Sequence, residues 1–224
     1  MKLINNKYNF SFEFNENLIN VLVCENEKIY NDIVTDLYKL ETESDLYSSF
    51  VLSNEEKHLD FNNNCEIIFN PFKIDINNKK NIEKMYHQLS KYMCLDNMYI
   101  EKNEIMEKLF IYINKLSLLS ECEITHNDKI DDKSILKFMG IELDNDGGFD
   151  DRLLNYMRVT NRLQGNKLYI FINLKSFIAL ESILRMYKDI EYNKLNILLI
   201  ENIDRGMVKN ENKIIIDRDG CIIA

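Results

Sequence analysis

The stretch that most constrains the fold lies near the C-terminus, at residues 167–201. Its two apolar runs, 168–172 and 195–200, are short and continuous, which predicts strands buried on both faces, as in a parallel sheet. Residues 176–190 between them show helical spacing, with Ser176 as the expected N-cap. The side chains expected to face inward are Phe177, Leu180, Ile183, Leu184 and Tyr187. Strand, helix and strand of this length predict a right-handed βαβ unit.

The N-terminal part of the chain supplies further strands for the same body. Aromatic residues alternate with polar ones over residues 8–14, which predicts a half-exposed antiparallel strand. A buried strand is expected at 18–23, followed by a helix over 27–40 with Asn26 as its N-cap. Further strands are expected at 48–52 and 65–69, and Pro71 should end the second of them.

The middle of the chain changes to helical patterns. Apolar residues recur at helical spacing over 78–95 and 101–119, and the short linker 96–100 predicts an antiparallel helical hairpin. Two more helices are expected at 133–139, before Gly140, and at 149–163. The fold class is therefore α/β. A head domain of residues 1–75 and 140–224 is interrupted by an α-helical domain of residues 76–139.

Several classes of site and location are disfavoured by composition. The five cysteines include no C-x-x-C pair, which indicates reduced thiols in a cytoplasmic protein. No apolar run approaches the roughly 20 residues that span a bilayer, and the N-terminus lacks the apolar core of a signal peptide. With six glycines and neither a P-loop motif nor G-x-G-x-x-G, a phosphate-cradling loop is not expected. The three histidines have no metal-type spacing.

Basic residues gather in two places although the net charge is −9. On the helix predicted at 78–95, four side chains fall at i, i+4, i+7 and i+11, and we call them the basic stripe: Lys80, Lys84, His87 and Lys91. On the helix predicted at 149–163, Arg158 and Arg162 form an arginine pair four residues apart. Cations in a line can follow a phosphate backbone, but a solvated lysine face has the same pattern.

Acidic residues gather between the helical patterns, within residues 121–132, which we call the acidic segment. Residues 121–151 hold ten acidic and three basic residues. A calcium ion with oxygen ligands would relieve the repulsion among these carboxylates, whereas a solvated loop is the simpler interpretation. The candidate ligands are Glu121, Glu123, Asp128 and Asp132.

Three segments carry a resemblance to a known family. They are PFKIDINN at 71–78, ILKFMGIEL at 135–143 and KLYIFINLKSFI at 167–178, together with the helices that lie between them. In order and spacing they resemble the CRISPR-associated spacer-acquisition protein of type II-A systems, the Csn-two family, over nearly the whole chain.

The resemblance implies a head similar to a degenerate P-loop ATPase, with an inserted helical leg and no working nucleotide site. It further implies a ring-shaped homotetramer without catalytic activity that encloses double-stranded DNA, prefers free ends and holds calcium. The implied partners are the CRISPR integrase and the effector nuclease. On this interpretation the basic stripe lines the ring and the acidic segment holds calcium.

Two other functions compete with a DNA-binding ring. A metal-dependent nuclease would use the acidic segment to hold magnesium, and its DNA cleavage would be lost when Asp128 and Asp132 are replaced. A nucleotide-binding regulator on a P-loop-like fold would bind ATP.

Overall fold

A computed structural model describes residues 1–14, 18–42, 48–55, 57–127, 129–206 and 208–223 of the chain. Its contacts divide the chain into two compact units, one of Met1–Ile76 with Asn145–Ala224 and the other of Asn77–Asp144. The second unit runs five residues past the boundary expected at 139. The reason is a pair of hydrogen bonds, because the Asn77 side chain donates to Leu143 O at 3.0 Å and accepts from Leu143 N at 2.7 Å.

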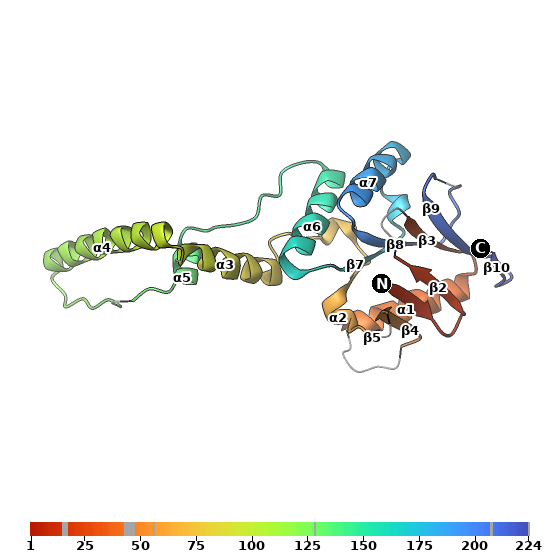
Figure 1. The fold of residues 1–224 in the computed structure, drawn as a ribbon, viewed down its shortest axis with the longest axis horizontal. Helices are drawn as coiled ribbons and strands as arrows, with labels where there is room; N and C mark the ends of the chain where they lie inside the picture. Colours follow the sequence, from red (N-terminus) through yellow and green to blue (C-terminus); the bar gives the residue numbers. More distant parts are fainter. Residues whose placement is uncertain (15–17, 43–47, 56, 128, 207, 224) are drawn as a thin grey trace. The chain divides into compact units, whose positions relative to one another are not determined.

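The first unit is built on a six-stranded sheet (Figure 1). Its order is β10 (Ile222–Ile223), β9 (Glu211–Ile216), β3 (Ile19–Cys24), β8 (Asn196–Glu201), β7 (Leu168–Ile172) and β6 (Cys65–Ile68). All neighbours are parallel except β9 and β10. The predicted pairing of the two C-terminal apolar runs is confirmed, since β7 and β8 are parallel neighbours with almost wholly buried residues.

The crossover helix between β7 and β8 differs from the prediction at its start. Asn173 adopts a left-handed conformation with φ 55° and leads into a short 3-10 turn, η2 (Leu174–Ser176). This turn delays α7 (Leu180–Tyr192), whose N-cap is Ala179 and not Ser176. The predicted inward face was therefore wrong in part: Phe177, Leu180 and Leu184 are exposed, and the buried residues are Ile183, Met186, Tyr187 and Ile190.

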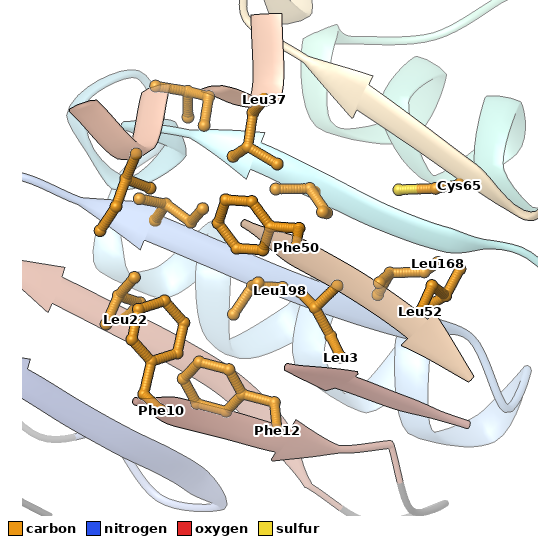
Figure 2. Close-up of a cluster of buried hydrophobic side chains, with 14 of the residues drawn as sticks. Leu3, Phe10, Phe12, Leu22, Leu37, Phe50, Leu52, Cys65, Leu168 and Leu198 are labelled. Carbon is orange, nitrogen blue, oxygen red and sulfur yellow. The ribbon is translucent and has the colours of Figure 1, made fainter. Parts of the chain in front are cut away.

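A second, antiparallel sheet and helix α1 cover one face of the large sheet. Its order is β2 (Phe10–Glu13), β1 (Lys2–Asn5), β4 (Phe50–Asn54) and β5 (Lys57–His58). The predicted alternation near the N-terminus is confirmed over β2, where Phe10 and Phe12 are buried and Ser11 and Glu13 exposed. The predicted start at residue 8 is wrong, because residues 6–9 form a turn in which Asn9 has φ 52°. Figure 2 shows the shared core, whose members include Leu3, Phe10, Phe12, Leu22, Leu37, Phe50, Leu52, Leu168 and Leu198.

Several local predictions for this unit are confirmed. Helix α1 (Glu27–Thr42) begins at the predicted cap, where Asn26 Oδ1 accepts from the amides of Lys28 and Ile29 at 3.1 Å each. A short α2 (Phe61–Asn64) precedes β6, and Pro71 opens η1 (Pro71–Lys73) after that strand has ended.

Two observations concern both units. The five cysteines are free thiols. No helix in the described ranges is long and apolar enough to cross a membrane.

The described residues of the second unit form three helices: α3 (Lys79–Met93), α4 (Asp96–Leu119) and α5 (Asp132–Phe138). Gly140, with φ 61°, follows α5 as predicted. The predicted antiparallel hairpin is wrong, because residues 96–100 are helical and only two residues separate α3 from α4. Figure 1 shows α4 continuing beyond the end of α3, and no residue of α4 is buried.

Candidate nucleic-acid interface

Helix α3 holds the basic stripe on a firmly anchored element. Its N-cap is Asn78, whose side-chain oxygen accepts from Asn81 N at 3.0 Å. Asn81 and Tyr86 are buried, and the Tyr86 hydroxyl donates to Ile141 O at 3.0 Å. This inward side fixes the rotation of the helix about its axis, so the opposite side is presented to solvent.

The four side chains of the basic stripe are all exposed. Their spacing places them on one side of α3, over about 16 Å along the helix axis. The helix contains one acidic residue, Glu83. Among the described residues, neither Lys84 nor Lys91 has an ion-pair partner. The stripe therefore offers three lysines and a histidine, at intervals of about 4.5 to 6 Å along the axis, that can contact phosphates without reading bases.

The arginine pair lies on α6 (Phe149–Gln164), in the other unit. This helix is held by its buried side, which includes Leu153, Leu154 and Met157, and it ends at Gly165 with φ 95°. Arg158 is half-buried and Arg162 is exposed. Neither guanidinium has an ion-pair partner in the part of the chain that the structure describes.

The described carboxylates of the acidic segment lie apart from one another or have other partners. Glu121 and Glu123 are exposed, Asp128 lies outside the described residues, and Asp132 pairs with Lys102 of α4 at 2.9 Å. No group of three or more His, Cys, Asp or Glu side chains in the described ranges could hold a metal ion. The described candidate ligands therefore do not converge on one point within a single chain.

Asp131, which was not among the candidate ligands, serves the helix instead. It is the N-cap of α5, and its Oδ1 accepts from Ser134 N at 3.1 Å. Hydrogen bonds from the Ser134 hydroxyl and amide lower the pKa of this carboxyl. Its charge thus stabilises a helix N-terminus.

Two cations of the second unit were missed by the sequence analysis. Lys133 and Lys137 are exposed on α5, four residues apart. The spacing that identifies the basic stripe also identifies them, but α5 has only 7 residues and shows the spacing once.

A comparison with protein families found one matching family. The family described as CRISPR-associated protein (Cas_Csn2) matches residues 40–220. The chain belongs to this family. The matched range contains the basic stripe, the arginine pair and the acidic segment, and it gives the protein a CRISPR-associated role. A search of curated proteins found no match.

Proposed function

We propose that this protein binds double-stranded DNA through phosphate contacts and supports the capture of new spacers by a CRISPR system. The observation that carries the proposal is the basic stripe, an exposed line of cations on the side of α3 opposite its buried residues. Contacts of this kind position a duplex and carry no sequence information. The proposed role is binding without catalysis, in the cytoplasm, alongside the CRISPR integrase and effector nuclease.

The proposed working unit is a closed homotetramer that surrounds the duplex and loads from free ends. Helix α4 supports self-association, because apolar side chains are exposed along its length and no residue of the helix is buried within one chain. Exposed apolar patches of this kind commonly mark interaction surfaces. The net charge of −9 also favours a ring, because closed symmetry can repeat one basic stripe around a channel.

We further propose that the first unit derives from a P-loop-like fold that has lost its nucleotide site. Support comes from the parallel sheet and from the connection between β3 and α1. That connection consists of Glu25 and Asn26 alone, and two residues are too few for a loop that wraps phosphates.

A gel-shift experiment tests DNA binding and its dependence on ends. We expect linear duplexes to bind and closed circles of equal length to bind weakly, since a ring cannot thread onto a circle. Replacing Lys80, Lys84 and Lys91 by Glu should abolish binding. The matched control replaces three exposed lysines elsewhere in the same unit, Lys108, Lys115 and Lys129. Equal loss in both triple variants would contradict the assignment of the stripe.

The metal-dependent nuclease is the alternative function. It predicts cleavage of linear DNA with magnesium or manganese, and loss of cleavage when Asp128 and Asp132 become Asn. In the described structure, however, Asp132 is paired with Lys102. We expect the DNA to stay intact after prolonged incubation. Metal-dependent cleavage that is lost with these two substitutions would contradict our proposal and support the nuclease.

Calcium binding by the acidic segment stays a prediction of the sequence. The excess of acidic residues over 121–151 supports it, and the Lys102–Asp132 ion pair opposes it. The predicted result is a higher melting temperature with calcium than with magnesium, because binding only to the folded state stabilises it. Replacing Glu123, Asp128 and Asp132 by Ala should remove the difference. Identical curves with calcium and with a chelator would contradict the prediction.

A further inference from the structure

Three phenylalanine side chains meet on the surface of the first unit. Phe72 of η1 stacks on Phe149, the first residue of α6, with ring centroids 4.6 Å apart and an angle of 28° between the ring planes. Phe72 also meets Phe177, which follows η2, in an edge-on arrangement with centroids 5.3 Å apart. We call these three residues the aromatic cluster. The fold brings them together from three separate segments of the chain.

The aromatic cluster is packed internally but open to solvent. Phe72, the ring that contacts both of the others, is 62% exposed, and Phe177 is 46% exposed. Phenylalanine is among the residues most often buried, so such exposure is informative when several rings share it. A ring that two neighbours hold in place, and that still exposes most of its surface, offers a flat apolar face to a ligand.

Three cations near the aromatic cluster have no ion-pair partner among the described residues: Lys73, Arg152 and Arg205. Lys73 follows Phe72 in the chain, and Arg152 lies about one helical turn beyond Phe149. Arg205 donates to Ser176 Oγ at 3.0 Å, directly before Phe177. The charge of Arg205 also acts on the buried Glu201, but the two side chains form no ion pair.

Several carboxylates near the aromatic cluster are already engaged. Those with interaction partners are Asp75, Asp146, Asp150 and Asp151. The last two pair with Arg185 of α7 at 3.5 and 3.6 Å. The exposed Glu181 at the start of α7 remains. The three unpaired cations outnumber it, so the surroundings of the cluster favour an anionic ligand.

We propose that the aromatic cluster binds unpaired bases of single-stranded DNA, while the three cations contact its phosphates. Proteins that hold single strands combine exposed aromatic rings, on which bases stack, with cations that follow the backbone. A duplex suits the cluster less well, because its bases are already paired and stacked. An acidic protein segment would satisfy the cations but would leave the flat ring faces without a matching partner. This site goes beyond the proposed duplex binding and does not depend on it.

The substitution Phe72→Trp makes the aromatic cluster its own reporter, because the chain contains no tryptophan. The full-length variant is titrated with a single strand of about 16 thymidines, the upper length that one binding module of this kind covers. We expect the fluorescence to be quenched as a base stacks on the indole. An abasic strand of the same length carries the same phosphates and should cause little quenching. The matched control is Tyr192→Trp at the end of α7, where the side chain is 86% exposed and makes no ring contact among the described residues.

Affinity measurements test the role of the ring. They use the variant in which Lys80, Lys84 and Lys91 are replaced by Glu, so that the basic stripe contributes nothing. In this background, Phe72→Ala should weaken binding of the thymidine strand at least about fivefold, the lower value for one base stacked on an aromatic ring. Phe72→Tyr should retain the affinity of the parent. The melting temperature should change little, because Phe72 is mostly exposed.

Four outcomes would overturn the proposal: no quenching of the Phe72→Trp variant, equal quenching by the abasic strand, equal affinity with and without the Phe72 ring, or displacement of the thymidine strand by polyglutamate at equal charge. The duplex-binding proposal is tested separately, because the aromatic cluster belongs to the first unit and the basic stripe to the second. Replacing the three lysines of the stripe should abolish the gel shift of linear duplexes and leave the quenching unchanged. Phe72→Ala should leave the gel shift of blunt duplexes unchanged.

Discussion

At the scale of single residues, Glu201 is a buried carboxylate at the end of β8. Burial raises its pKa from 4.5 to about 7, although it accepts a hydrogen bond from Lys175 N at 2.9 Å. Between these two pH values the folded protein binds a proton that the unfolded chain releases. The free energy of unfolding therefore falls as pH rises from about 4.5 to about 7. Above pH 7 the destabilisation by the buried charge of Glu201 is complete.

Replacing Glu201 by Gln should stabilise the protein at pH 8 by about 1–3 kcal/mol, because each pKa unit corresponds to about 1.4 kcal/mol. The amide oxygen can still accept from Lys175 N. At pH 4.5 the gain should be much smaller. Urea unfolding at both pH values measures it, with the exposed Glu181→Gln on α7 as control. Equal effects of Glu201→Gln at the two pH values would contradict the assignment.

The sequence predicted the exposure of residues that is set by the spacing within a single helix. The basic stripe is exposed because helical spacing places it opposite Ile82, Met85 and Leu89, which are partly buried. By contrast, the Lys102–Asp132 pair joins residues 30 positions apart. No local pattern predicts such a contact, so the sequence assigned Asp132 to calcium while the fold pairs it with a lysine.

At the scale of elements, sequence periodicity located the helices better than it located their ends. The start of α7 was missed because Ser176 is a good N-cap residue, yet its hydroxyl accepts from Arg205 at 3.0 Å within a 3-10 turn. The linker expected at 96–100 is the first turn of α4, where Asp96 suits the positive end of the helix dipole. Only Cys94 and Leu95 separate the two helices, and α4 does not fold back on α3.

The exposed apolar side of α4 leads to a prediction about assembly. Ile105, Tyr112 and Leu116 lie at i, i+7 and i+11, and their exposed fractions are 64%, 57% and 43%. Replacing Ile105 and Leu116 by Asp should dissociate the oligomer, because charges would replace apolar contacts between copies. Each monomer should stay folded, since the side chains are exposed within one chain.

Light scattering at several concentrations measures this change in mass, and circular dichroism checks the fold. The control is Asn103→Asp, which adds a charge to α4 on the side opposite Ile105 and is exposed. If the double Asp variant keeps the mass of the parent, α4 is not part of the interface between copies.

At the scale of the whole molecule, the sequence predicted an α/β body because its buried strands are continuous apolar runs. The separate antiparallel sheet β2-β1-β4-β5 was not predicted as such, since alternation along a strand does not reveal which sheet the strand joins. The aromatic cluster was also missed. Its rings come from Phe72, Phe149 and Phe177, and no single stretch of sequence contains them.

The salt dependence of DNA binding tests the molecule as a whole. An acidic chain of net charge −9 can bind a polyanion only if local cations displace counterions from phosphates. The logarithm of the binding constant should therefore fall linearly with the logarithm of salt concentration, with a slope of about −0.9 for each phosphate contacted. Duplexes of equal length and unrelated sequence should give the same line.

Replacing Lys84 and Lys91 by Ala should make this slope less steep by about two for each subunit that contacts the DNA. Both side chains lack ion-pair partners among the described residues. Their removal therefore leaves no carboxylate there without its partner, and the melting temperature should stay the same. The slope difference divided by two then gives the number of subunits in contact with one duplex, and a closed tetramer predicts a value between two and four. A lower affinity with an unchanged slope would mean that these lysines act through the fold and not through phosphates.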